Sequence, residues 1–512
     1  MLMFSRRRLA LSLLALLAAT GLSGCAMLIP SPDLERLVSR VEVPKTWQQA
    51  DCAGAEACAA PLALSRWWLQ LEDEKLTALI ARGLAQAPEM RLATTRLRQA
   101  REARNLAASG LWPTLGASLS ASRTPGSGAD SRMTLYRAGF DAAWEPDLFG
   151  VTRQGVTAAD AALAGAGARL EDAQVTLAAE IALNYTEARL KQEQLYIACR
   201  NTASQGELFE ITRWRTQAGL ATDLDVEQAR ATLAQTRASI PTLENSLIAS
   251  LNQLDTLLGE VPGTLAKQGF LREGKAFSEA AASRVHTENS AADARLLRLP
   301  EGCATAVSPD LPRVPEGIAA DIPAETLYRR PDVREAEWAL RAEIASLRSV
   351  LAERFPSLRL SGSLGWQDTR FADLVSPENL ARSLVASVAA QIFDGGRLKA
   401  RIGMQDAVAE TTLITYEQTL LTALAEVENA LSSYATGQQR LAEREIAAIS
   451  AQNAERMARQ LYQTGLADFQ RVLDAQRSRL VAEESLAVGR GDLVVAVIQL
   501  YKALGGGWTP AS

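Results

Sequence analysis

The sequence predicts a mainly α-helical protein with a membrane β-barrel part, built from a duplicated half-chain. Three observations lead to this fold class. A glycine-centred stretch at residues 217–229 recurs at residues 463–475, two long segments contain no proline, and four short segments alternate apolar and polar side chains. Alternation with a period of two predicts strands, and long segments without a helix breaker predict long helices.

Composition bounds the class of protein before any motif is considered. The chain has 512 residues, 47% hydrophobic and 22% charged, so it can bury a core and is no disordered polyelectrolyte. Its formal net charge of -5 provides no basic stripe for phosphates, which argues against nucleic acid as a partner. One histidine, His286, and five scattered cysteines argue against a metal or histidine-dependent catalytic site, so we expect no enzyme.

The N-terminus has the layout of an export signal. Three arginines precede an apolar stretch that is too short to be a good membrane span, and small residues follow it. The ending Leu22-Ser23-Gly24-Cys25 resembles the bacterial lipobox, so residues 1–24 are the predicted signal peptide and Cys25 the predicted lipid attachment site. Ala26 after this cysteine implies sorting to the outer membrane. The alternative is an ordinary cleavage site followed by a small buried cysteine.

The other cysteines are less informative. Cys52 and Cys58 lie close together in the sequence, and an oxidising periplasm permits a disulfide between them. Two free thiols are the alternative. Cys199 and Cys303 fit no metal motif, and the sequence assigns them no role.

The repeat organises the rest of the chain. Gly219 and Gly465 lie 246 positions apart, and the same offset aligns residues 179–195 with 425–441. A period this long indicates duplication of a half-chain and excludes a solenoid. The predicted segments are an anchor segment at 25–75, a first repeat at 76–259, a proline-rich linker at 260–325, a second repeat at 326–504 and a tail at 505–512.

Each repeat is expected to contain a helix, a strand pair and a hairpin of two very long helices. The hairpins are predicted at about 150–259 and 397–504, because these segments are rich in Ala, Leu, Glu, Gln and Arg. At 1.5 Å per residue the longer helix reaches about 100 Å, which is too long for a compact globule. A spacing of 4, 3, 4 and 3 predicts a coiled-coil seam, with one face of an ordinary bundle helix as the alternative. The seam residues are Leu420, Leu424, Val427, Leu431 and Tyr434.

Gly219 and Gly465 are predicted to sit at the tips of the two hairpins. A glycine can adopt the left-handed conformation that follows the last turn of a helix. Thr222 or Asp223 can then cap the next helix of the first hairpin, and Asp468 can cap that of the second.

The four alternating segments are predicted to form β-hairpins at about 113–146 and 356–394. About ten residues with one apolar face suit a tilted membrane strand, while a soluble hairpin is the alternative. The predicted lipid anchor favours the membrane. Four strands cannot close around a lumen, so the barrel must be shared between copies of the chain.

Four stretches carry a resemblance to a known family. They are "RWWLQLEDEKLTALIARGLAQAPEMRLA" at 66–93, "LYRRPDVREAEWAL" at 327–340, "FDGGR" at 393–397 and "YQTGLADFQRVLDAQRSRL" at 462–480. With this layout, the chain resembles the TolC-type outer-membrane efflux channels, in particular the lipoprotein branch that serves resistance-nodulation-division pumps. The resemblance implies a homotrimer with a twelve-stranded barrel, a periplasmic helical barrel and a mixed equatorial domain. It also implies a periplasmic adaptor and an inner-membrane pump as partners, outer-membrane lipid as surroundings and no cofactor beyond the lipid on Cys25.

The resemblance also implies a periplasmic gate at the hairpin tips. Asp474 matches an acidic residue of the aperture, Asp225 a tip aspartate, and Tyr462 its tyrosine partner. Arg471 and Asp468 join the predicted gate, because Arg471 stands where some members have an acidic residue and can pair with a neighbouring aspartate. Two further departures from the family are Ala467 and Gln470. The alternative is that these residues only cap or solvate a helical turn.

Together these features predict a passive exit duct. Three subunits would carry small solutes or drugs, expelled by an inner-membrane pump, across the outer membrane. The alternative is a periplasmic coiled-coil adaptor lipoprotein without a pore. A secreted hydrolase is disfavoured, because the chain has no Gly-x-Ser-x-Gly motif and no metal-ligand spacing.

Overall fold

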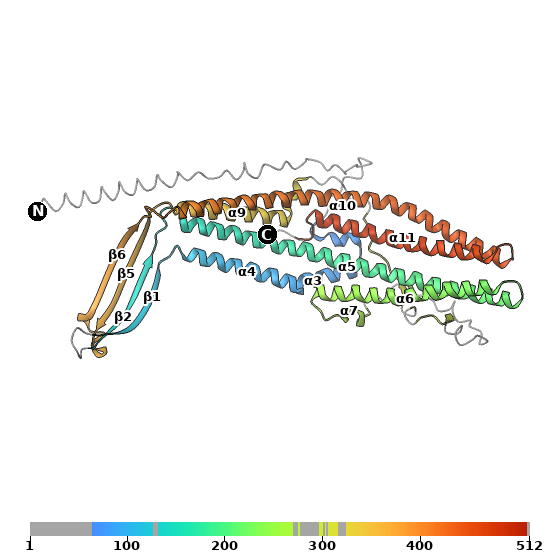
Figure 1. Cartoon of the computed structure of the whole chain (residues 1–512), viewed down its shortest axis with the longest axis horizontal. Helices are drawn as coiled ribbons and strands as arrows, with labels where there is room; N and C mark the ends of the chain where they lie inside the picture. The colour runs from blue at the N-terminus through green and yellow to red at the C-terminus, as the bar shows by residue number, and fades with distance from the viewer. Residues whose placement is uncertain are drawn as a thin grey trace. The chain divides into compact units, whose positions relative to one another are not determined.

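The structure is a computed structural model that describes residues 64–125, 132–269, 275–276, 296–300, 303, 306–315 and 324–508. The predicted signal peptide, Cys25, Cys52 and Cys58 lie outside these residues. Figure 1 shows the helices and the strands in chain order. Among the described residues, no helix combines the length and the apolar character needed to cross a membrane.

The two halves of the chain contain matching helices. Both longest helices have 67 residues, their hairpin partners have 36 and 35, and the helices before the strands have 22 each. This agreement is the structural counterpart of the sequence repeat. The pairs are α4 (Pro88–Ser109) with α9 (Pro331–Ala352), α5 (Val151–Gln217) with α10 (Arg397–Gln463), and α6 (Asp223–Leu258) with α11 (Phe469–Ala503).

Short elements complete the chain. They are η2 (Leu64–Leu71), α3 (Glu74–Gln86), α7 (Thr264–Lys267), β3 (Lys275–Ala276), β4 (Val307–Ser308), η5 (Ala324–Arg329), η6 (Phe371–Asp373) and η7 (Pro377–Asn379). β3 and β4 pair with each other within the segment predicted to be a proline-rich linker.

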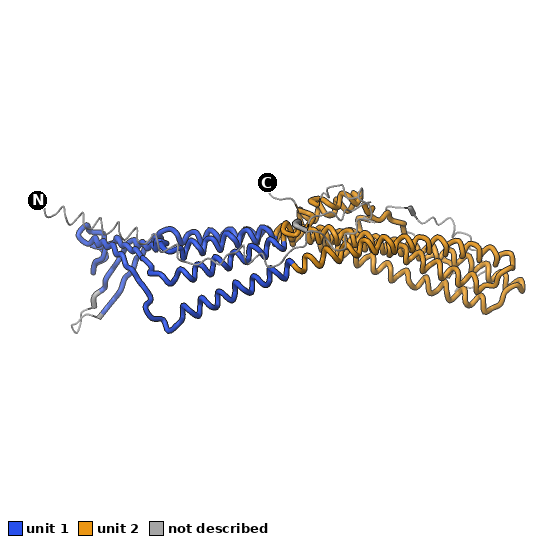
Figure 2. Tube along the Cα trace, turned by 90° about the horizontal axis from the view of Figure 1, so that it is seen from above, with its two compact units in different colours: residues 1–42, 94–169, 332–420 blue, residues 43–93, 170–331, 421–512 orange. Residues whose placement is uncertain are grey.

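The chain forms two compact units that cut across the sequence repeats (Figure 2). Of the described residues, the first unit holds Thr94–Arg169 and Asp332–Leu420, and the second holds the remainder. Each repeat contributes to both units, because α5 and α10 each contain residues of both.

The first unit contains a four-stranded antiparallel sheet in the order β1, β2, β5, β6. Its register aligns apolar residues of all four strands in one row, Leu119, Ala138, Trp366 and Leu380. The predicted alternation therefore places the apolar side chains of both repeats on one face. The strands are β1 (Thr114–Pro125), β2 (Arg132–Trp144), β5 (Ser357–Asp368) and β6 (Leu380–Ala389).

The two faces of this sheet differ in chemistry. Leu115 and Leu384 on the apolar face are 74% and 85% exposed in one subunit, as expected for a surface that faces lipid. On the other face, Ser118 donates a hydrogen bond to Asp141 at 3.2 Å. β6 ends at Ala389, earlier than the alternation predicts. Its partner β5 begins only after Pro356, which has no N–H to extend the ladder.

The second unit holds the largest core. Trp67 is fully buried and stacks on Tyr501 with ring centroids 5.3 Å apart. Trp68 is also buried, so both tryptophans are core residues. Tyr185 of α5 donates a hydrogen bond to Asp73 at 2.8 Å. This core joins the N-terminal segment to the long helices and the end of α11.

Two observations qualify the predicted helices. α6 continues through Pro241, although an internal proline removes one backbone hydrogen bond. In the predicted seam of α10, Leu420, Val427, Leu431 and Tyr434 are buried, whereas Leu424 is only half-buried. The period of 3.5 therefore identifies the buried face of this helix.

Candidate functional site

Each helical hairpin ends in the same type of turn. Gly219 has a φ of 71° and Gly465 a φ of 78°, so both adopt the predicted left-handed conformation. In the first turn, Leu220 N donates to Arg215 O at 2.8 Å; in the second, Leu466 N donates to Leu461 O at 2.8 Å. These bonds close a Schellman motif after α5 and another after α10.

The helices that leave the turns are capped by different side chains. Thr222 caps α6 in a capping box: its hydroxyl accepts from Asp225 N at 3.3 Å, and its backbone N donates to the Asp225 carboxylate at 3.0 Å. Of the two predicted caps, Thr222 is therefore correct and Asp223 is not. Asp468 caps α11 by accepting from Arg471 N at 3.1 Å, as predicted.

Tyr462 joins the two hairpins near their tips. Its side chain is 3% exposed, and its ring lies edge-on against Phe469, with centroids 5.9 Å apart. From the first hairpin, the Arg215 guanidinium lies 4.6 Å from the ring centroid and donates to Tyr462 O at 3.0 Å. The Tyr462 hydroxyl lies 3.5 Å from the hydroxyl of Thr212. Residues of all four hairpin helices form the apolar cluster around it.

The structure separates the predicted gate residues into two groups. Tyr462 is buried, whereas Asp468, Arg471 and Asp474 are exposed in one subunit. Asp474 accepts from Gln470 at 3.3 Å, and Arg471 lies 4.0 Å from the Asp468 carboxylate. Within one subunit no hydrogen bond joins Tyr462 to Asp225, both of which are described residues, because Asp225 belongs to the capping box.

A second connection between the hairpins lies farther from the tips. Glu483 of α11 accepts from Arg479 at 2.8 Å and from Gln452 of α10 at 3.0 Å, and it forms an ion pair with Arg200 of α5. Burial alone would raise the pKa of Glu483, but the hydrogen bond from Arg479 and the charges of Arg200 and Arg479 lower it below its usual range. Glu483 is therefore held ionised.

Another ion pair lies between these two connections. Arg459 of α10 meets Glu207 of α5 at 2.6 Å, and it also lies 3.5 Å from the hydroxyl of Ser204. Both partners keep part of their solvent contact, so this pair contributes less to stability than a buried one. It nevertheless joins α5 to α10 directly.

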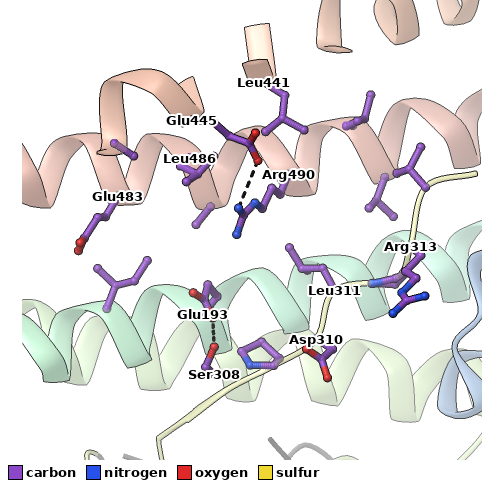
Figure 3. Close-up of a pocket in the computed structure, with 18 of the residues that line it drawn as sticks. Glu193, Ser308, Asp310, Leu311, Arg313, Leu441, Glu445, Glu483, Leu486 and Arg490 are labelled. Atoms are coloured by element: carbon purple, nitrogen blue, oxygen red, sulfur yellow. Dashed lines mark hydrogen bonds and ion pairs between the residues drawn. The ribbon is translucent and has the colours of Figure 1, made fainter. Parts of the chain in front are cut away.

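A cavity of about 1190 Å³ is lined by α5, α10, α11 and residues 308–314 (Figure 3). Figure 3 shows two of its polar pairs: Glu445 with Arg490 at 3.3 Å, and Glu193 with the Ser308 hydroxyl at 3.1 Å. Burial raises the pKa of Glu193. Glu445 and Glu193 therefore each have a polar partner in the wall of the cavity.

Cys199 and Cys303 form a disulfide across 104 positions. It attaches the linker to α5 inside a small apolar cluster with Ile240 of α6. The sequence assigned these cysteines no role. The available signal was parity: if Cys25 is acylated and Cys52 pairs with Cys58, as predicted, two cysteines remain to pair with each other.

The described residues contain no group of three or more His, Cys, Asp and Glu side chains that could hold a metal ion. The residues that the sequence analysis did not identify are those that connect the two helical hairpins. They are Thr212 and Arg215 around Tyr462, and Arg200 and Gln452 around Glu483.

Comparison with known proteins gives one consistent family. The family described as outer membrane efflux protein matches residues 79–260 and 322–506. The pyoverdine export outer membrane protein OpmQ of Pseudomonas aeruginosa is 28% identical over 506 residues, 97% of each chain. The solvent efflux pump outer membrane protein SrpC of Pseudomonas putida is 26% identical and covers 97% of this chain and 98% of its own.

Solved structures agree with this family. The outer-membrane channel OprN superposes with a TM-score of 0.75 at 31% identity, covering 94% of this chain and 100% of OprN. The Campylobacter jejuni outer membrane channel CmeC has a TM-score of 0.77 at 19% identity, covering 94% and 96% of the two chains. At that identity, the likeness to CmeC concerns the fold alone.

Proposed function

Since this chain belongs to the outer membrane efflux protein family and forms the trimeric outer-membrane channel of a tripartite efflux system, we propose that it is a passive duct gated at its hairpin tips. The system's other components are a periplasmic adaptor and an inner-membrane pump. In this proposal the chain performs no chemical reaction, so it is not an enzyme. The energy for export comes from the pump, and the duct supplies only a path across the outer membrane.

The observation that carries the duct is the register of the sheet. β1 and β6 are edge strands in one subunit, and the apolar face extends across all four strands, with Arg382 of β6 as a charged residue within it. The edge strands leave backbone N–H and C=O groups unpaired beside a surface that faces lipid. These groups gain hydrogen-bond partners when the sheets of three subunits join into one barrel. The alternative, a periplasmic adaptor lipoprotein without a pore, does not explain a sheet with an exposed apolar face.

The proposed cargo is small solutes or drugs without a dedicated binding pocket in the duct. One relative is named for pyoverdine export and another for solvent efflux, and both align with this chain over nearly their whole length. Relatives of the same architecture are thus named for chemically different compounds. This supports a system in which the pump selects the exported compound and the tunnel discriminates little between compounds.

The proposed gate places three Asp474 carboxylates, one from each subunit, near the channel axis. Asp474 is exposed in one subunit, and among the described residues it accepts a hydrogen bond from Gln470. Like charges close to one axis repel each other and attract cations. The proposed lipid on Cys25 would add a second membrane attachment to the barrel.

Single-channel recording of the purified full-length protein in a planar bilayer tests the duct. We expect discrete, ohmic conductance steps without nucleotide or any other energy source. A properly folded, membrane-bound trimer that produces no conductance steps would instead support the adaptor.

A further inference from the structure

Tyr462 is held by two residues that lie one turn apart on α5. Arg215 and Thr212 have a spacing of three, so they project from the same face of the helix. Arg215 lies over the Tyr462 ring at 4.6 Å, and the Thr212 hydroxyl approaches the phenol oxygen at 3.5 Å. The first hairpin thus covers a face of the ring, while Phe469 of the second hairpin meets it edge-on.

Arg215 also completes the end of α10. The last carbonyls of a helix have no partner within the helix and carry partial negative charge, so a cation there is favourable. α10 has no basic residue in its own last turn. Arg215, in the last turn of α5, donates to Tyr462 O at 3.0 Å, and Gly465 N donates to the same oxygen at 3.1 Å.

A flat guanidinium suits this double contact. It can place its face on an aromatic ring and direct an N–H toward an oxygen at the same time, which a lysine ammonium cannot match. The contact with the tyrosine oxygen at 3.5 Å is at the limit of a hydrogen bond. The ring and the backbone carbonyl are therefore the stronger attachment points, and the phenol hydroxyl is the weaker one.

Asp225 is committed elsewhere in the same subunit. Its carboxylate accepts from both the backbone N and the hydroxyl of Thr222, at 3.0 and 2.9 Å. These bonds hold the first turn of α6. Of the described residues on the first hairpin, Arg215 therefore makes the principal polar attachment to Tyr462.

We propose that Arg215 is the positioning residue that fixes the end of α10 to the first hairpin and thereby keeps the tunnel in its resting, narrow state. This inference rests on the proposed gate at the hairpin tips and assigns it a residue. Opening would require the guanidinium to leave both the ring and the carbonyl of Tyr462. The Schellman turn at Gly465 would then lose the hydrogen bond that Arg215 of the first hairpin donates to Tyr462 O.

The test compares single-channel conductance of assembled trimers. Loss of the ring contact and of one charge-assisted hydrogen bond should shift the closed-to-open ratio by about tenfold. Arg215→Ala and Arg215→Gln should therefore raise the resting conductance, and Arg215→Lys should give an intermediate value. Tyr462→Phe keeps the ring and the carbonyl, so it should stay close to wild type. Arg456→Ala is the matched control, because Arg456 is an exposed arginine of α10 that contacts Asn453.

Hydrogen exchange provides a second readout that does not depend on a pore. Arg215→Ala should speed exchange at the amides of Gly465 and Leu466 while leaving those around Gly219 unchanged. Wild-type conductance for Arg215→Ala and Arg215→Gln, or unchanged exchange at Gly465, would overturn the inference. If wild-type trimers conduct nothing, the proposed function fails, and hydrogen exchange still decides whether Arg215 holds α10.

Discussion

Glu483 of α11 and Arg200 of α5 form an ion pair that connects the second helical hairpin to the first. Glu483 is 5% exposed on its side chain, and it also accepts from Arg479 and Gln452. The Glu483 carboxylate is therefore largely desolvated and hydrogen-bonded at both oxygens, which is the condition under which a buried charge is tolerated. Tyr462 and Glu483 are two attachment points along the same pair of hairpins.

Glu483→Gln should destabilise the protein by about 2 kcal/mol. Removal of one partner from a buried pair leaves an uncompensated charge, and the partial exposure of Arg200 and Arg479 reduces the usual cost. Chemical denaturation of the wild type, Glu483→Gln, Arg200→Met and the double variant forms a double-mutant cycle, which measures the coupling energy between the two side chains. Strictly additive effects of the two substitutions would show that Arg200 and Glu483 do not interact.

Glu193→Gln should stabilise the protein at neutral pH. The folded state raises the pKa of this carboxyl through burial, so its contribution to stability is complete below the unfolded value of about 4.5 and is lost as pH rises through the folded value. The glutamine can still accept from Ser308 and carries no charge. The gain in melting temperature should therefore vanish as pH falls to about 4. Glu443→Gln, at an exposed position of α10, is the control; a gain that does not depend on pH would contradict this explanation.

Cys199→Ser with Cys303→Ser should lower the free energy of unfolding by up to about 4 kcal/mol, because the bridge closes a loop of about 100 residues. Intact-mass measurement after alkylation without reductant should find both thiols blocked in the wild type. Alkylation of Cys199 and Cys303 would refute the bridge. The Cys52–Cys58 disulfide stays a prediction, and the same measurement tests it.

Cys25→Ser should abolish acylation and slow removal of the signal peptide. Trimers should still reside in the membrane, because a closed barrel pairs all backbone hydrogen-bonding groups of its strands within the lipid and needs no lipid anchor to stay there. Incorporation of labelled palmitate, followed by fractionation of the membranes, checks both statements. Equal labelling of wild type and Cys25→Ser would show that the lipid attachment site was assigned wrongly.

The local features of this fold were predictable because each depends on residues that are close together in the sequence. Gly219 and Gly465 indicated a left-handed backbone, and Asp468 offered a cap for the next helix, all within a few positions. Strand alternation was equally local, so it predicted which side chains share a face of the sheet, although it did not fix the pairing register.

Contacts between the hairpins were not predictable in the same way. Arg215 and Tyr462 are 247 positions apart, and their contact depends on how two long helices pack against each other. The periodicity of one helix gives its buried face but not the axial register with its neighbour. The contact of Thr222 with the Asp225 carboxylate is different, because it spans only three positions; it is a local capping box that the match of Asp225 to a gate residue overlooked.

The most direct test of the central claim, a trimeric channel narrowed by the hairpin tips, is the effect of Cd²⁺ on the conductance of Asp474→Cys. Three thiolates close to one axis bind a soft metal ion, and the bound ion would obstruct the passage. We predict that Cd²⁺ blocks the current through Asp474→Cys trimers reversibly and leaves wild-type current unchanged. Asp474→Cys trimers that conduct equally well with and without Cd²⁺ would contradict the placement of Asp474 at the aperture.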